Sequence, residues 1–96
     1  MERRKLEATE LEEALTDLSG WSVEDGKLSK EYKFSSFAEA MGWMVSVSIF
    51  ADGIDHHPDW SNSYNRVNVE LITHDMDALS TLDVALARRM QELAPA

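Results

Sequence analysis

The chain has 96 residues, of which 44% are hydrophobic and 28% charged, and this predicts one globular domain over residues 1–96. The formal net charge of −9 argues against a nucleic-acid surface, and no apolar run is long enough for a transmembrane helix or a secretory signal. The absence of cysteine excludes a disulfide framework and a thiolate nucleophile, and it fits a cytoplasmic protein.

Residues 1–7 are expected to be a frayed end, in which the run Arg3-Arg4-Lys5 supplies solubilising charge. A helix is predicted over residues 9–18, because Thr9 and Glu12 have the spacing of a capping box. Its apolar stripe consists of Leu11, Leu15 and Leu18, and Ser19-Gly20 ends it.

The next segment has the pattern of a β-hairpin. Asp25-Gly26 separates residues 21–24 from residues 27–34, and Asp-Gly is a strong signal for a two-residue turn. In the second arm, Leu28, Tyr32 and Phe34 share one face, on which Lys30 is the polar exception. The arm is therefore predicted to be a half-buried strand.

A second helix is predicted from Ser36, which has capping-box spacing to Glu39, to about Ala51, before Asp52-Gly53. One apolar stripe contains Phe37, Ala40, Met41, Met44 and Val45, and a second contains Trp43, Val47 and Phe50. A helix that is apolar nearly all round is buried on both sides. We expect one side to pack on the sheet and the second stripe to face outward, against another subunit. The alternative is that Trp43 and Phe50 cover loose ends of the same core.

The clearest strand is predicted over residues 64–73, where Val67, Val69 and Leu71 alternate with polar residues. A last helix is predicted from about Ser80 to Leu93, with an apolar face formed by Leu82, Leu86, Met90 and Leu93. Strands that can pair antiparallel thus alternate with three helices. This order predicts an α+β two-layer sandwich, with a small antiparallel sheet of about four strands and the helices on one face.

The three histidines are the candidates for chemistry. His56 and His57 precede Pro58, which restricts the backbone, and His74 lies at the end of the long strand. If residues 55–60 pair beside that strand, the histidines converge with Asp83, in the first turn of the last helix. Histidine is the side chain best suited to exchange protons near pH 7.

Each of these residues also has a structural interpretation. His74 can be a polar surface residue, Asp83 can serve the helix dipole and the cap, and Trp60 can belong to the core. A zinc site is the rival chemical interpretation, because three histidines can hold this ion. Adjacent residues of an extended chain point to opposite faces, however, and no His-x-His or His-x-x-x-His pair is present. We therefore expect no metal.

The motifs resemble those of the pterin-4a-carbinolamine dehydratases over about residues 20–87. The resemblance is carried by Gly20-Trp21, Phe37-x-x-Ala40-x-x-x-Met44, Asp55-His56-His57-Pro58-Asp59-Trp60, Tyr64-Asn65-x-Val67, Leu71-x-Thr73-His74 and Leu79-Ser80-x-x-Asp83. It implies an antiparallel sheet with three helices on one side and no metal or other cofactor. The implied activity is the dehydration of a 4a-hydroxytetrahydropterin, left by pterin-dependent aromatic amino acid hydroxylases, to the quinonoid dihydropterin.

Carried over by position, the resemblance implies a set of site residues. The catalytic ones would be His56, His57, His74 and Asp83, and the pterin-binding ones Asp52, Asp55 and Trp60. We expect His57 and His74 to exchange protons with the C4a hydroxyl and N5, His56 to position or replace one of them, and Asp83 to orient His74. The chain departs from the family pattern at Asp52-Gly53, where Glu-Lys is frequent, and at Ala78-Leu79, where Gly-Leu is frequent. We expect these departures to affect substrate affinity more than reaction type.

A non-catalytic role is the alternative. Relatives in this family also act as protein-binding partners, including as a dimerisation cofactor for a homeodomain transcription factor. We expect a homodimer or homotetramer formed through the 36–51 helix, a sheet edge or both. The intact histidines favour the enzyme, because a scaffold could lose them freely.

Overall fold

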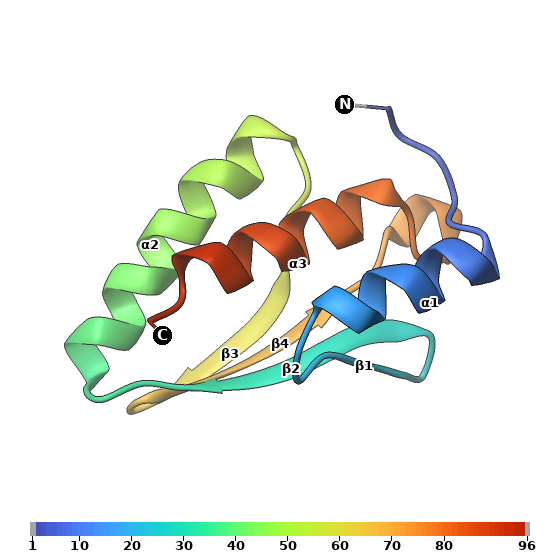
Figure 1. Cartoon of the computed structure of the whole chain (residues 1–96). Helices are drawn as coiled ribbons and strands as arrows, with labels where there is room; N and C mark the ends of the chain where they lie inside the picture. The colour runs from blue at the N-terminus through green and yellow to red at the C-terminus, as the bar shows by residue number, and fades with distance from the viewer. Residues whose placement is uncertain (1, 96) are drawn as a thin grey trace.

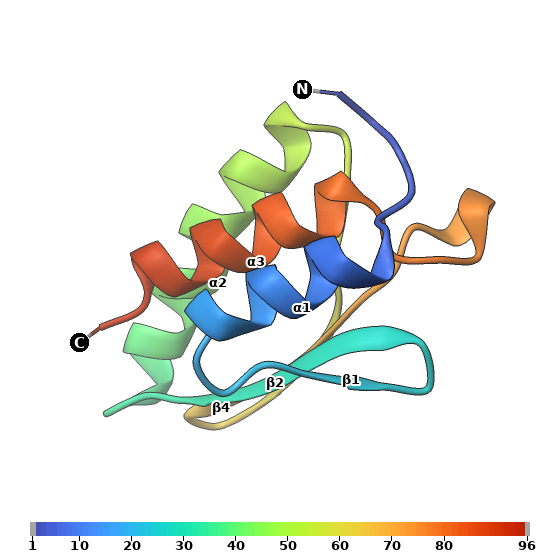
Figure 2. The ribbon, with the colours of Figure 1, turned by 45° about the vertical axis from the view of Figure 1, so that its right-hand side comes forward.

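The computed structural model describes residues 2–95. In chain order, its elements are α1 (Ala8–Asp17), β1 (Ser22–Glu24), β2 (Lys27–Lys33), α2 (Phe37–Gly53), β3 (Asp59–Ser63), β4 (Arg66–Leu71), the short 3-10 helix η1 (His74–Met76) and α3 (Thr81–Leu93). The strands pair antiparallel in the order β1-β2-β4-β3. The three α-helices lie on one face of the sheet (Figure 1, Figure 2). The predicted α+β fold is confirmed.

Both hairpin turns use residues with positive φ. Asp25 and Gly26 have φ angles of 54° and 74°, as the type I′ turn favoured by Asp-Gly requires, so the first hairpin is confirmed. The second turn lies at Tyr64, with a φ of 51°, and Asn65. The strand expected over residues 64–73 is therefore shorter, because its first two residues lead the chain from β3 into β4.

The core lies between the sheet and the helices. Its fully buried members include Leu28, Val67, Val69 and Leu71 from the sheet and Val47, Leu86 and Met90 from the helices. Trp43 Nε1 donates a hydrogen bond of 3.0 Å to the carbonyl oxygen of Met90, which links α2 to α3. Because these two helices are fixed against each other, the loop that follows α2 is held near the start of α3.

The side of α2 that is buried is not the side that was expected. Trp43 and Val47 are buried in the core and Phe50 packs against it, so the expectation that this stripe faces another subunit is wrong. The exposed side carries other apolar side chains, namely Phe37, Val45 and Ile49, which are 49%, 62% and 72% exposed. The apolar periodicity of α2 identifies two stripes but does not tell which of them is buried, because that depends on how the helix packs on the sheet.

Helix α1 begins earlier than expected. Its N-cap is Glu7, and the backbone N–H of Glu7 donates to Glu10 Oε1 at 3.0 Å, so the capping interaction lies here and not between Thr9 and Glu12. The guanidinium of Arg4 binds both carboxylate oxygens of Glu10 at 2.6 Å. These hydrogen bonds lower the pKa of Glu10 to about 2 and raise that of Arg4. The ion pair therefore helps to set where the helix begins.

Residues 2–6, which were expected to be frayed, lie alongside residues 79–81; we call them the N-terminal strap. The backbone N–H of Leu6 donates to Leu79 O and that of Thr81 donates to Arg4 O, both at 3.0 Å. Lys5 and Ser80 form an antiparallel bridge between these contacts. The strap therefore packs across the beginning of α3.

Helix α3 matches the prediction closely. Ser80 is its N-cap and forms a capping box with Asp83, and Leu82, Leu86 and Met90 are buried. Within residues 2–95, the structure contains no helix with both the length and the apolar character needed to cross a membrane.

Candidate active site

The candidate residues gather at the end of the molecule where α2 ends, β3 begins, β4 leads into η1 and α3 begins (Figure 1). The loop after α2 folds back on the helix, because the N–H groups of Ile54, Asp55 and His56 donate to carbonyl oxygens of its last turn. Asp55 has a φ of 50°, a left-handed conformation that Asp tolerates better than most residues. This turn carries His56 to Asp83 at the start of α3, while His57 returns to Asp52 in the last turn of α2.

His56 is buried and bound to Asp83. Its Nε2 lies 2.6 Å from Asp83 Oδ1, and the carboxyl group of Asp83 is fully buried. Asp83 Oδ2 accepts from Thr73 Oγ1 at 2.8 Å and from the backbone N–H of Ser80 at 2.9 Å. A buried acid is expected to be hydrogen-bonded in this way, because an unpaired one would be strongly destabilising.

The hydroxyl groups around Asp83 have a defined donor order. Thr73 Oγ1 has one proton, which it donates to Asp83, so Ser80 Oγ at 2.6 Å must be the donor to Thr73 Oγ1. Ser80 Oγ in turn accepts from the N–H of Leu82. The network fixes Asp83, and Asp83 fixes the ring of His56.

His57 and His74 are exposed, and each is bound to a different acid. Nε2 of His57 lies 2.8 Å from Asp52 Oδ1, at the end of α2. Nε2 of His74 lies 2.8 Å from Asp59 Oδ2, at the start of β3. The side chain of His57 is 59% exposed and that of His74 is 70% exposed, so both are open to a molecule from solution.

All three rings thus turn the same nitrogen to a carboxylate. A carboxylate can only accept hydrogen bonds, so Nε2 must carry the proton in each pair. In the neutral state of each ring, the lone pair is therefore on Nδ1. The arrangement offers two exposed imidazoles that can accept or donate a proton at Nδ1 without breaking the bond to their acid.

The pairing corrects one expectation. Asp83 was expected to orient His74 but is bound to His56, because the start of α3 lies beside the loop after α2. The acid bound to His74 is Asp59, to which sequence reasoning gave no role. Asp59 could have been noticed because it follows His57 by two residues in an extended segment, where alternate side chains share a side.

The two other predicted substrate-binding residues, Asp55 and Trp60, lie in different surroundings. Asp55 lines an open hollow of about 330 Å³, together with Arg3, Gly53, Ile54 and Leu82. Trp60 is partly buried, with its ring 6.0 Å from that of Trp43, and it alternates with Asp59 along β3. It therefore packs towards the core, and its role as an aromatic wall stays a prediction.

Within residues 2–95, no group of three or more His, Cys, Asp or Glu side chains is arranged to hold a metal ion.

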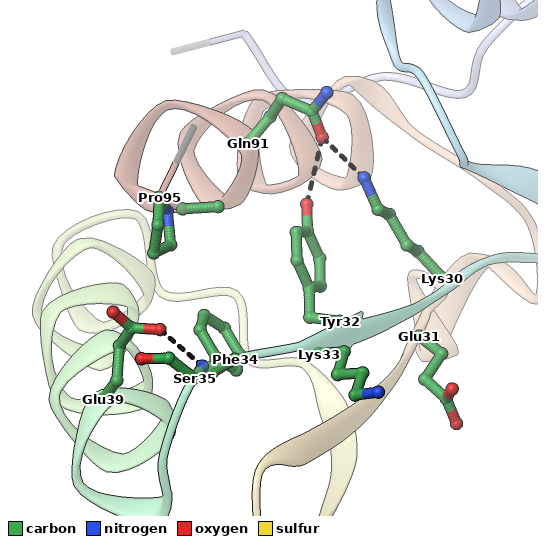
Figure 3. A pocket seen from close by; sticks show the side chains of 10 residues that line it. Lys30, Glu31, Tyr32, Lys33, Phe34, Ser35, Glu39, Gln91 and Pro95 are labelled. Atoms are coloured by element: carbon green, nitrogen blue, oxygen red, sulfur yellow. Dashed lines mark hydrogen bonds between the residues drawn. The ribbon is translucent and has the colours of Figure 1, made fainter.

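A hollow of about 750 Å³ lies between β2, the start of α2 and the end of α3, and no predicted site residue lines it (Figure 3). Its polar groups bind one another: Gln91 Oε1 accepts from Tyr32 Oη and from Lys30 Nζ, both at 3.1 Å. Burial raises the pKa of Tyr32 to about 12 and lowers that of Lys30. These contacts join the sheet to α3. The histidines therefore remain the candidate catalytic groups.

Comparison with known proteins agrees with the fold and with the family that the sequence resembles. The chain belongs to the family described as "Pterin 4 alpha carbinolamine dehydratase", whose sequence model matches residues 4–93. Curated relatives named "Putative pterin-4-alpha-carbinolamine dehydratase" include proteins of Brucella ovis and Brucella melitensis biotype 1. Each is 41% identical over 96 residues, which cover 98% of this chain and 99% of the relative.

Two solved structures resemble the fold. One is a crystal structure of a "transcriptional coactivator/pterin dehydratase" from Brucella melitensis, with a TM-score of 0.89 and 39% identity, covering 96% of this chain and all of that one. The other is a pterin dehydratase-like protein identified as a RuBisCO assembly factor in the alpha-carboxysome. Its TM-score is 0.64 at 19% identity, covering 79% of this chain and 88% of that one, so it supports the fold alone.

Proposed function

We propose that this protein dehydrates 4a-hydroxytetrahydropterin to the quinonoid dihydropterin by general acid–base catalysis and so supports tetrahydropterin recycling. Its membership of the dehydratase family supports this reaction. The observation that carries the proposal is the pairing of all three histidines, through Nε2, with separate carboxyl groups at one end of the molecule. Such pairs keep imidazoles oriented for proton transfer.

The reaction breaks the C4a–O bond and the N5–H bond and forms a C4a=N5 double bond, with water as the second product. One group must protonate the departing hydroxyl, and another must take the proton from N5. We assign these roles to His57 and His74, which are exposed, with Nδ1 as the reacting nitrogen of each. An acid or base in position contributes roughly 10²–10⁴-fold to the rate.

His56 is assigned a supporting role. It is buried and bound to Asp83, so its ring is held by the network of Thr73 and Ser80. It would position the substrate or relay a proton, while Asp83 acts through it. Asp55, which lines the nearby hollow, would accept hydrogen bonds from the amino and ring N–H groups of the pterin. Asp52 is bound to His57, so we propose that it orients this ring as well as contacting substrate.

The test replaces the exposed histidines one at a time. His57→Ala and His74→Ala are expected to lower kcat for a synthetic 4a-hydroxytetrahydropterin by roughly 10²–10⁴-fold each, since each removes one proton-transfer group. The measurement is the absorbance change on dehydration, corrected for the uncatalysed rate. Glu24→Ala on β1, at the opposite edge of the sheet from β3, is the matched control and should keep the wild-type rate. Wild-type rates in both histidine variants would disprove the assignment.

The alternative is a non-catalytic interaction protein. It is favoured by the exposed apolar residues Phe37, Val45 and Ile49 on α2 and by the similar Brucella melitensis protein, which is described as a transcriptional coactivator as well as a pterin dehydratase. The same assay separates the two functions. A wild-type protein that binds a reduced pterin without accelerating dehydration, or that does neither, would favour the interaction role.

We further propose that the chain forms a homodimer or homotetramer, with the exposed side of α2 as the contact surface. A sheet edge is the second candidate, since one side of β3 has no neighbouring strand within the described sheet. The proposed substrate would come from a pterin-dependent aromatic amino acid hydroxylase. The cysteine-free composition fits a reducing compartment, and we place the protein in the cytoplasm.

A further inference from the structure

The hollow that Asp55 lines is also lined by a residue from the other end of the chain. Gly53, Ile54 and Asp55 come from the end of α2 and its loop, Leu82 comes from α3, and Arg3 comes from the N-terminal strap. Asp55 immediately precedes His56, and Leu82 immediately precedes Asp83. The two segments that supply His56 and Asp83 therefore also line this hollow.

The geometry points to Arg3 as a substrate-binding residue of this site, where its guanidinium donates hydrogen bonds to the carbonyl edge of a pterin. This inference rests on the proposed function for the identity of the ligand. It gives a role to the basic run of the N-terminus, which composition alone presented as solubilising charge.

The strap holds Arg3 in a defined place. Thr81 forms three hydrogen bonds with the strap. Its N–H donates to Arg4 O at 3.0 Å, its Oγ1 donates to Glu2 O at 2.5 Å, and the same Oγ1 accepts from the N–H of Arg4 at 3.3 Å. The bridge between Lys5 and Ser80 continues this contact. Arg3 lies between Glu2 and Arg4, so its backbone is anchored on both sides directly over the N-terminus of α3.

The side chain of Arg3 is oriented by η1. Its Nη2 forms an ion pair with Asp75, the residue after His74, and the side chain is 44% exposed. A guanidinium has five N–H donors in a planar fork, so one edge can stay on Asp75 while another faces the hollow. Arg3 thus connects the turn that carries His74 with the hollow that Asp55 lines.

The lining of the hollow complements a flat heterocycle with donors and acceptors along one edge. The pyrimidinone ring of a pterin presents a carbonyl oxygen as an acceptor, next to ring N–H and amino groups as donors. Asp55 can accept from the donors and Arg3 can donate to the carbonyl, while Ile54 and Leu82 provide apolar surface for the ring. A lysine would supply the charge without the fork, so the recognition depends on arginine.

The test measures binding and turnover in the full-length protein. The probe is 7,8-dihydrobiopterin, a stable reduced pterin, titrated while tryptophan fluorescence is followed. Arg3→Ala is expected to weaken its binding by about tenfold, because a hydrogen bond from a charged donor is lost. Arg3→Lys should lie between Arg3→Ala and the wild type. In the dehydration assay, Arg3→Ala should raise KM by a similar factor and leave kcat nearly unchanged, because Arg3 takes no part in proton transfer.

Arg4→Ala is the matched control, since Arg4 lies in the same strap but its guanidinium binds Glu10 and Glu2. It should bind the probe as the wild type does. Equal probe binding by Arg3→Ala and wild type, an equal loss in Arg4→Ala, or no binding by the wild type would overturn the inference. If the wild type binds the probe and Arg3→Ala does not, but neither dehydrates the substrate, the Arg3 site stands and the proposed reaction fails.

Discussion

At the scale of single residues, each imidazole depends on one carboxyl group, and the three pairs differ in burial. His56 and Asp83 are buried, whereas His57 with Asp52 and His74 with Asp59 are exposed to water. Surface ion pairs contribute little to stability, so the two exposed pairs are better explained by orientation of the rings than by folding energy. We therefore infer that Asp59 positions the ring of His74.

Asp59→Ala tests this role. It is expected to lower kcat for dehydration by about tenfold, because the lost hydrogen bond no longer holds the ring and its tautomer. Imidazole ¹⁵N chemical shifts should change from mainly the Nε2–H tautomer of His74 to a mixture of both tautomers. Asp59→Glu should restore part of the rate, which a merely structural effect would not explain.

Glu70→Ala is the control for Asp59, because Glu70 lies opposite Asp59 in the sheet register. This variant should leave both the rate and the ¹⁵N shifts of His74 unchanged. An unaltered tautomer signal in Asp59→Ala would rule out the positioning role.

At the scale of secondary structure, most elements follow from local signals. The Asp25-Gly26 turn, the Ser80–Asp83 capping box and the alternation along β4 depend on neighbouring residues, and all three were predicted. The start of α1 was misplaced because Glu7 and Glu10, and not Thr9 and Glu12, form the capping box. The buried side of α2 was misassigned because both of its sides are apolar, so the choice depends on the sheet.

Val47→Ala tests the corrected orientation of α2. Val47 is fully buried, so the change removes about two methyl groups and leaves a cavity. The free energy of unfolding should fall by about 2 kcal/mol, measured by urea denaturation. Val23→Ala on β1, where Val23 is 41% exposed, should change it by less than about 0.5 kcal/mol. Equal effects at the two positions would contradict the assigned orientation.

At the scale of the whole molecule, one surface is unusual for a monomer. Phe37, Val45 and Ile49 lie at i, i+8 and i+12 on the outer side of α2, and all three are exposed. Val45 and Ile49 are neighbours one turn apart, and adjacent exposed apolar side chains mark interaction surfaces more often than scattered ones do. For a domain of 96 residues, burying this side would also enlarge a thin core.

The double substitution Val45→Glu with Ile49→Glu tests this surface. If α2 mediates self-association, light scattering after size-exclusion chromatography should show a lower mass for the variant than for the wild type. Two carboxylates would have to be buried unpaired in the contact, which is strongly unfavourable. Val23→Glu on β1 is the control and should keep the wild-type mass. A monomeric wild type, or a double variant of unchanged mass, would contradict the proposed assembly.

The sequence by itself determined the fold class, the approximate elements and the three histidines, because periodicity, turn residues and caps act between neighbours in the chain. It also carried the resemblance to the family, and the comparison confirmed that the chain belongs to this family. Only the tertiary structure decided which acid binds which histidine, which side of α2 is buried, and that Arg3 lines the same hollow as Asp55. These outcomes depend on how segments far apart in the chain pack against one another; Arg3 and Asp55, for example, are 52 residues apart and line one hollow.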